Sequence, residues 1–366
     1  MYVNLDFFGP NQASHTMRQI ASTRNIFPAI LVALFLTAAT GYSFTALYVF
    51  GDSLSDTGRN PAPAGTNYYD GRYCNGPLWI EYLSTNLGIT YSYSNNFAVS
   101  GSTTSNLLSQ IAGLTPGPDL QSGLFTLISG GNDFFYSAES LGTTNSLWDN
   151  MVTNAVRNLT NAISAIYTDG GRELIVGNLV NVGQTPAFFL KFPAGYGNFV
   201  DTKVALFNTL FATALTNVLQ YSPGLRLYFF DDNLGFSNIL NSAASLGFTV
   251  TNNNDALDDT NLTDKSFNGP GADYLFWDDV HTTTKADALT AAAAYEFVAA
   301  QLRIAPSGTN FNLNVINLYP TLSYTVQGST NLTTWTNYQT ITATTTDATL
   351  VLTNKPGTKA FYRVLY

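Results

Sequence analysis

Residues 46–58 read ALYVFGDSLSDTG, so an apolar run at 46–49 passes directly into a glycine-flanked polar turn that contains Ser53. A continuous apolar run that ends in Gly and Asp is typical of a parallel strand buried on both faces. A serine on the tight turn after such a strand is poorly placed for packing and well placed to attack a bound molecule. The stretch therefore predicts a parallel sheet with a reactive hydroxyl at the end of its first strand.

Short apolar runs alternate with amphipathic stretches from about residue 44 to residue 304. The expected strands cover residues 46–50, 90–93 (the weakest), 124–129, 173–178 and 225–231. The expected helices cover residues 79–87, 151–169, 201–219 and 285–302. This alternation predicts a three-layer α/β/α, doubly wound parallel sheet with right-handed crossovers and the flavodoxin-like strand order 2-1-3-4-5.

Polar loops follow the first three expected strands. Ser53 follows the first, Gly101 the second, and the run Gly130-Gly131-Asn132-Asp133 the third. In the order 2-1-3-4-5 these three loops are neighbours, and ligands of such sheets bind beyond the carboxyl ends of the strands. We therefore expect one site at this edge.

The chain has only two histidines, His15 and His281. His15 lies in an N-terminal segment that we expect to be removed, which leaves His281 to accept a proton from Ser53. Asp278 and Asp279 shortly precede His281, and either carboxylate can orient its ring.

Ester cleavage by a serine also needs hydrogen-bond donors for the developing oxyanion. Backbone amides around Ser53 and Gly101, with the side chain of Asn132, can supply them. A glycine at 101 lets a substrate approach the backbone, and an amide at 132 donates without bringing a charge. Each feature alone has a structural alternative: a turn, a loop glycine, solvated acids or a surface histidine. The combination of all four, in order, favours a reaction site.

Composition excludes several classes of function. The formal net charge is −9 with only 11% charged residues, so no basic surface is available to neutralise nucleic-acid phosphates. The same acidity disfavours electrostatic docking on anionic lipid. Cys74 is the only cysteine, which rules out an intramolecular disulfide and a Cys-rich metal site. We expect an enzyme without metal or cofactor.

The N-terminus is typical of a signal peptide. Arg18 and Arg24 precede an apolar stretch at 26–36, and small residues follow at 38–41. We assign residues 1–41 to this segment, with Met17 as an alternative start and a buried N-terminal helix as the alternative interpretation. No later segment is apolar enough, for long enough, to be an integral membrane span.

The sequence pattern changes after residues 303–308. Residues 42–305 form the expected α/β domain, whereas residues 306–366 show short alternating runs separated by turn residues. We interpret 306–366 as a small β-rich module, with strands near 322–327, 335–342, 349–352 and 360–364.

Four blocks of the α/β domain resemble the GDSL-type lipase/esterase family of the SGNH hydrolase superfamily. They are residues 50–58 (with Gly51, Asp52 and Ser53), 96–102 (with Gly101), 130–133 (with Asn132 and Asp133) and 278–281 (with Asp278 and His281). Stretches 69–79 and 274–277 resemble the branch that includes plant-type GDSL esterases and bacterial thermolabile-haemolysin-like phospholipases. The resemblance covers roughly residues 46–302.

The resemblance implies a carboxylic ester hydrolase that works through an acyl-enzyme without a cofactor. It implies Ser53 as nucleophile, His281 as base and Asp278, rather than Asp279, as the residue that orients the base. The implied oxyanion hole consists of the Ser53 and Gly101 amides and the Asn132 side chain. Ser100 and Thr282 stand where the family usually has Gly and Pro, and neither change removes a catalytic group. The implied substrate is a small-molecule, lipid or acylated-sugar ester.

Residues 306–366 resemble small β domains at the ends of secreted proteins from Verrucomicrobia-like bacteria. This suggests an exported bacterial protein, extracellular, periplasmic or attached to the cell surface through 306–366; the alternative is a passive β appendage. Two other functions stay open: an acyltransferase to a lipid, sterol or sugar, and an inactive surface- or carbohydrate-binding protein.

Overall fold

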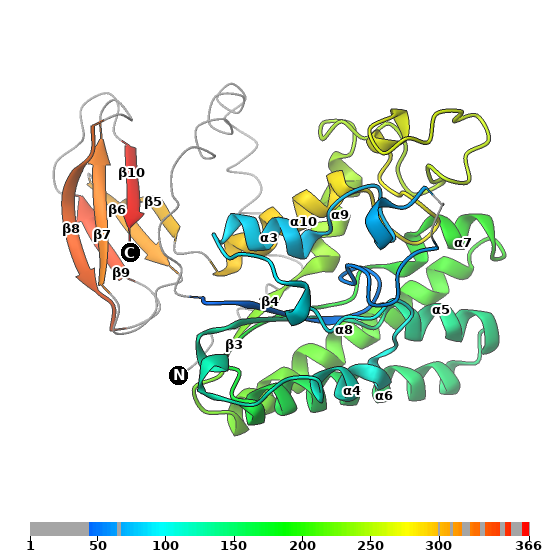
Figure 1. Ribbon diagram of the computed structural model, residues 1–366, viewed down its shortest axis with the longest axis horizontal. Coiled ribbons are helices and arrows are strands. Elements are labelled where there is room, and N and C mark those ends of the chain that lie inside the picture. The colour runs from blue at the N-terminus through cyan, green and yellow to red at the C-terminus, as the bar shows by residue number, and fades with distance from the viewer. Residues whose placement is uncertain are drawn as a thin grey trace. The chain divides into compact units, whose positions relative to one another are not determined.

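Four parallel strands form the central sheet of the computed structural model, which describes residues 44–63, 67–298, 301–307, 310–316, 323–329, 334–344, 348–352 and 361–365 (Figure 1). They lie in the order β1 (Leu47–Gly51), β2 (Leu124–Ile128), β3 (Glu173–Gly177), β4 (Arg226–Phe230). Every neighbouring pair is parallel. These strands confirm four of the five sequence predictions. The expected signal peptide lies outside the described residues.

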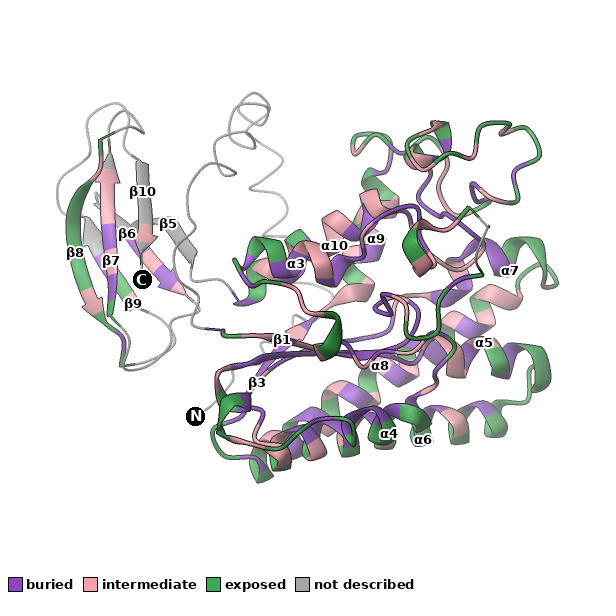
Figure 2. Cartoon of the chain, in the orientation of Figure 1, coloured by how far each residue is buried: buried purple, intermediate pink, exposed green. Residues whose placement is uncertain are grey.

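Helices cover both faces of this sheet. Phe50, Phe125 and Val176 pack into one cluster with residues of α4 (Leu107–Ile111), α6 (Asn145–Asp169) and α8 (Tyr196–Tyr221). Val49 and Ile175, which point to the other face, pack with α3 (Trp79–Asn86) and α10 (Thr284–Val298). The strands are therefore buried on both sides, as their continuous apolar runs require. The result is the expected three-layer α/β/α arrangement (Figures 1 and 2).

The second strand is not where the sequence predicted it. Residues 90–93 form no strand, and the chain makes a 3-10 turn at Tyr93–Asn95. The edge of β1 is instead occupied by the next segment, where Phe97 N donates to Val49 O at 2.7 Å and Val99 N to Gly51 O at 3.2 Å. Asn96 forms a parallel bridge to Val49. The segment therefore takes the place of strand 2 in the order 2-1-3-4-5, but its pairing is too short to form a regular strand.

Four described α-helices were not predicted from the sequence: α4, α5 (Gly131–Ser140), α7 (Pro186–Leu190) and α9 (Asp232–Ser242). Because α5 starts at Gly131, Asn132 and Asp133 lie in its first turn rather than in a free loop. The expected helix at 285–302 was too long, since α10 ends at Val298 and a strand covers Gln301–Ser307. No helix among residues 44–63 and 67–298 is long and apolar enough to cross a membrane.

The described C-terminal residues contain six strands. Four lie where the alternation predicts strands, whereas those at Gln301–Ser307 and Asn310–Ile316 were not predicted. One sheet has the order β5-β6-β9, from β5 (Gln301–Ser307), β6 (Asn310–Ile316) and β9 (Ala348–Leu352). The other has the order β10-β7-β8, from β7 (Ser323–Ser329), β8 (Thr336–Thr342) and β10 (Phe361–Leu365). Described residues from both sheets and their connections share one buried apolar cluster: Leu313, Val315, Tyr324, Val326, Ala343 and Leu350. The expected boundary between residues 305 and 306 stays a prediction.

Candidate active site

The turn after β1 explains why a glycine precedes the Asp-Ser pair. Gly51 has φ = +150°, and a Cβ atom there would lie 2.2 Å from the carbonyl oxygen of Ile128 on β2. Only glycine fits so close to the neighbouring strand. The Asp52 carbonyl then accepts hydrogen bonds from Ser55 N and Asp56 N, both at 3.0 Å, and closes the turn. Ser53 lies within this turn and is 8% exposed.

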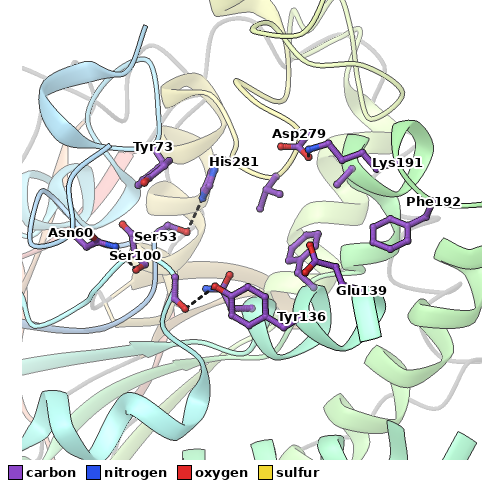
Figure 3. Close-up of a pocket in the computed structure, with 15 residues that line it drawn as sticks. Ser53, Asn60, Tyr73, Ser100, Tyr136, Glu139, Lys191, Phe192, Asp279 and His281 are labelled. Carbon is purple, nitrogen blue, oxygen red and sulfur yellow. Dashed lines mark hydrogen bonds and ion pairs between the residues drawn. The ribbon is translucent and has the colours of Figure 1, made fainter. Parts of the chain in front are cut away.

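The side chains of Ser53, His281 and Asp278 form one hydrogen-bonded chain. Ser53 Oγ lies 2.7 Å from His281 Nε2, although 228 residues separate them in the sequence (Figure 3). His281 Nδ1 lies 2.8 Å from Asp278 Oδ2 and 2.9 Å from Asp278 Oδ1. Asp278 Oδ1 also accepts the backbone N–H groups of Val280 and His281, at 2.9 and 2.7 Å. The tight loop between Asp278 and His281 thus holds the carboxylate against the imidazole.

Asp279, the other carboxylate that the sequence left open, is paired with a different residue. Its side chain pairs with Lys191 Nζ, just beyond α7 (Figure 3). Its carbonyl oxygen accepts Ala187 N at 2.8 Å. Asp279 therefore fastens α7 to the loop that carries His281, and of the two carboxylates only Asp278 is hydrogen-bonded to the ring.

The charges around His281 favour its protonated form. Burial by itself would lower the pKa of His281, but the Asp278 carboxylate and its hydrogen bond to Nδ1, with the charges of Asp52 and Asp279, raise this pKa above 6.5. For Asp278, burial alone would raise the pKa, yet the His281 charge and four hydrogen bonds bring it below its ordinary value. The pair is therefore suited to stabilise an imidazolium that forms during a reaction.

Hydrogen bonds between the loops bring the other two sequence blocks to Ser53. Asp56, in the first block, accepts the backbone N–H and the hydroxyl of Ser100 at 2.7 and 2.9 Å. Asn132 Nδ2 donates to Ser102 O at 2.9 Å. Asp133 accepts from Thr104 N at 2.9 Å and from Thr104 Oγ1 at 2.8 Å. The three loops are thus neighbours, as the predicted strand order requires. The Ser100 hydroxyl makes a hydrogen bond to Asp56 that a glycine at this position could not make.

Gly101 adopts φ = +83°, a left-handed conformation that favours glycine. Its carbonyl oxygen accepts the Tyr136 hydroxyl at 3.2 Å. Ser53, Gly101 and Asn132 all line one pocket of about 350 Å³. An Asn side chain has two N–H donors, so the bond from Asn132 to Ser102 leaves a second donor for a ligand.

The far part of this pocket mixes aromatic and charged side chains. Its remaining lining residues are Asn60, Tyr73, Ser100, Phe135, Tyr136, Glu139, Ala187, Lys191, Phe192, Asp279, Val280 and His281 (Figure 3). Tyr73 packs against the His281 ring, with 5.1 Å between the ring centroids.

Among the described residues, no group of three or more His, Cys, Asp or Glu side chains is arranged to hold a metal ion.

Two motif carboxylates lie beside the site: Asp52 is buried and Asp133 is partly buried. Burial raises the pKa of Asp52 to about 6, against the hydrogen bond that it accepts from Leu54 N. Burial also raises the pKa of Asp133, against its hydrogen bonds from Thr104. Their contacts are with the turn after β1 and with the loop before α4, so both hold loops in place.

Three contacts at the site were not predicted. Asp56 joins the first two blocks, as described above. Gln110 pairs with the Gly51 backbone, its Nε2 donating to Gly51 O at 2.8 Å and its Oε1 accepting Gly51 N at 3.0 Å. Tyr68 donates its hydroxyl to Asp278 Oδ2 at 2.6 Å. No spacing or motif in the sequence indicates these contacts, because each depends on loop conformation.

Comparison with known families identifies the family of this chain. Residues 47–294 match the family described as GDSL-like Lipase/Acylhydrolase. The chain belongs to this family. It is therefore a carboxylic ester hydrolase, and the matched region contains all four blocks described above.

Several curated GDSL relatives resemble most of the chain. A GDSL esterase/lipase of Arabidopsis thaliana is 25% identical over 68% of this chain and 81% of its own length. Acetylajmalan esterase 2 of Rauvolfia serpentina is 26% identical over 57% of this chain and 75% of its own. A phosphatidylcholine-sterol acyltransferase of Aeromonas hydrophila is 46% identical, over only 15% of this chain and 18% of its own.

Among solved structures, an acetylxylan esterase from Geobacillus stearothermophilus aligns at 13% identity with a TM-score of 0.41, covering 71% of this chain and 98% of that one.

Proposed function

We propose that this GDSL hydrolase cleaves carboxylic esters through an acyl-enzyme on Ser53. The observation that carries the proposal is the chain Ser53 Oγ–His281 Nε2–Asp278, with links of 2.7 and 2.8 Å. His281 takes the Ser53 proton as Oγ attacks the ester carbonyl carbon, and Asp278 stabilises the imidazolium. The tetrahedral intermediate collapses as His281 gives this proton to the leaving alcohol. Water then attacks the acyl-Ser53 ester by the same steps and releases the acid.

We assign the oxyanion hole to the backbone N–H groups of Ser53 and Gly101 and to the side chain of Asn132. These donors are held before any substrate binds, because Asn132 is tied to Ser102 and Ser100 is tied to Asp56. A donor that needs no rearrangement stabilises a developing charge at little cost.

Replacing the oxyanion donor provides the first test. We expect Asn132→Ala to lower kcat on p-nitrophenyl butyrate by about 10²–10³, with a much smaller change in KM, because the donor acts mainly in the transition state. Steady-state kinetics measure both constants. Asn158→Ala is a matched control, since Asn158 bonds Thr104 Oγ1 at 3.2 Å in the neighbouring loop and does not line the pocket. If Asn132→Ala and this control behave alike, the assignment of the Asn132 amide fails.

The pH dependence provides a second test. The base must be neutral to accept a proton, and the pKa of His281 is raised by Asp278 and by the charges of Asp52 and Asp279. We therefore expect kcat/KM to fall about tenfold per unit of pH below an apparent pKa that lies above 6.5. A pH profile with a soluble short-chain ester measures it. An acid limb at or below 6.5 would contradict the proposed charge environment.

Acyl transfer is the second candidate function, because a short stretch of the chain matches the Aeromonas acyltransferase. In that reaction an acceptor alcohol replaces water in the attack on acyl-Ser53. Product analysis with added glycerol, a sterol or a sugar separates the two. Acyl transfer that outpaces release of free acid would favour the transferase.

We also propose that the enzyme is exported, since Arg18, Arg24 and the apolar stretch at 26–36 have the pattern of a signal peptide. Attachment to the cell surface through residues 306–366 remains a proposal from their sequence resemblance. N-terminal sequencing of the exported protein tests the cleavage near residue 41.

A further inference from the structure

Tyr68 makes a contact with the proposed catalytic residues that the reaction described above does not use. Its hydroxyl donates to Asp278 Oδ2 at 2.6 Å, the oxygen that also faces His281 Nδ1 at 2.8 Å. The other carboxylate oxygen, Oδ1, is held by the backbone N–H groups of Val280 and His281. Tyr68 is therefore the donor, from outside the 278–281 loop, that fixes the second oxygen of Asp278.

The position of Tyr68 is fixed by its neighbours on both sides. Trp277 Nε1 donates to Asn67 O at 2.8 Å, which fastens the backbone next to Tyr68 to the stretch that precedes Asp278. The Tyr68 ring packs against Tyr73 with 5.2 Å between centroids, and Tyr73 packs in turn against His281 at 5.1 Å. The hydroxyl is thus presented to the carboxylate by a packed structure and not by a freely rotating side chain.

We propose that Tyr68 is a positioning residue for ester hydrolysis, holding the Asp278 carboxylate in the orientation that aligns His281 with Ser53. This inference rests on the proposed function. Of the two donors described for Asp278 Oδ2, only His281 Nδ1 remains when the Tyr68 hydroxyl is removed. The carboxylate and the imidazole can then rotate together, which places His281 Nε2 less accurately toward Ser53 Oγ. Because Tyr68 does not line the pocket, its effect falls on kcat rather than on substrate binding.

The Tyr68 hydroxyl also weakens the negative potential that the Asp278 carboxylate exerts on His281. Burial, with the charge of Asp278, raises the pKa of Tyr68 above 10, so Tyr68 stays a donor throughout the neutral range. A donor on Oδ2 withdraws part of the carboxylate's negative potential. The other titratable groups near His281 are Asp52 and Asp279, with Asp287 on α10. Burial raises the pKa of Asp52 to about 6 and that of Asp287 to about 7. All three residues are present in the wild type and in Tyr68→Phe, so the difference between the two pH profiles reports on the hydroxyl.

The test is Tyr68→Phe, which keeps the ring and removes only the donor. We expect kcat on p-nitrophenyl butyrate to fall about tenfold, the size expected for a lost hydrogen bond to an ionised group, with KM unchanged within about twofold. The acid limb of the kcat/KM profile should move to higher pH. Without the Tyr68 donor, the Asp278 carboxylate keeps more of its negative potential and raises the pKa of His281 further. Tyr69→Phe is the matched control, since its ring packs on Phe267 at 5.6 Å, and it should leave both constants and the profile as in the wild type.

A double-mutant cycle separates positioning from a general effect on the fold. In an Asp278→Asn background the further change Tyr68→Phe should cost less than about threefold, because its carboxylate target is already gone. Equal losses in both backgrounds, or wild-type kcat and acid limb in Tyr68→Phe, overturn the inference. If Ser53→Ala retains activity, the proposed function itself fails. This result is distinct from a failure of the inference on Tyr68 alone. Should Tyr68→Phe not fold, 3-fluorotyrosine at position 68 keeps the ring and strengthens the donor, and the acid limb must then move to lower pH.

Discussion

Ser53→Ala is expected to lower kcat on p-nitrophenyl butyrate by about four to six orders of magnitude while leaving the fold intact. The loss is large because no other hydroxyl in the turn lies against His281: Ser53 Oγ is 2.7 Å from Nε2, whereas Ser55 Oγ accepts from Trp79 Nε1 at 3.1 Å. Removing one oxygen from a small side chain creates no large cavity. The free energy of unfolding should change by no more than about 1 kcal/mol.

Ser55→Ala is the matched control for this variant. It removes a hydroxyl from the same turn and leaves the buried Trp79 N–H without its partner. We therefore expect the opposite outcome: a loss of about 1–3 kcal/mol in stability with kcat retained below the unfolding temperature. Thermal unfolding and steady-state kinetics of both variants measure the contrast. If both lose activity in proportion to stability, Ser53 has no special role.

Asp278→Asn should lower kcat by about 10³–10⁴, the second largest effect. An amide can donate to His281 Nδ1 and so hold the ring in the wrong tautomer, and it cannot stabilise the imidazolium. The acid limb of kcat/KM should also move to lower pH, because the carboxylate is the main group that raises the pKa of His281. A pH profile of the residual activity measures this shift.

The Asp279→Asn variant distinguishes the role of Asp279 from that of the adjacent Asp278. It breaks the contact with Lys191 but leaves the Asp278–His281 bond in place. We expect a loss of about tenfold at most, since a half-exposed ion pair contributes little. If Asp279→Asn is as damaging as Asp278→Asn, the orienting role belongs to the loop as a whole and not to Asp278.

The strands and the main site residues could be predicted from the sequence because strong local signals mark them. Strands β1 to β4 are continuous apolar runs that end in small or polar residues, and burial on both faces leaves them no other placement. Ser53 and His281 could be paired because only one histidine lies beyond the expected signal peptide. In the structure their side chains approach to 2.7 Å at the carboxyl edge of the sheet.

Features that depend on tertiary contacts could not be predicted in the same way. The segment beside β1 is held by two backbone hydrogen bonds and has no β-rich run of its own, so the expected strand was placed at 90–93. The choice of Asp278 over Asp279 came from family resemblance, since spacing alone left both open. The contact of Tyr68 with Asp278 joins residues 210 apart and depends on how the loop near Tyr68 folds.

Covalent reaction at Ser53 can be measured by mass spectrometry after treatment with a fluorophosphonate ester. We expect one adduct per chain, located by fragmentation at Ser53 in the tryptic peptide that ends at Arg59, and a loss of activity proportional to the extent of labelling. Labelling should be absent in Ser53→Ala and much slower in His281→Ala. An adduct on a different residue, or full ester turnover by a chain labelled at Ser53, would show that Ser53 is not the nucleophile.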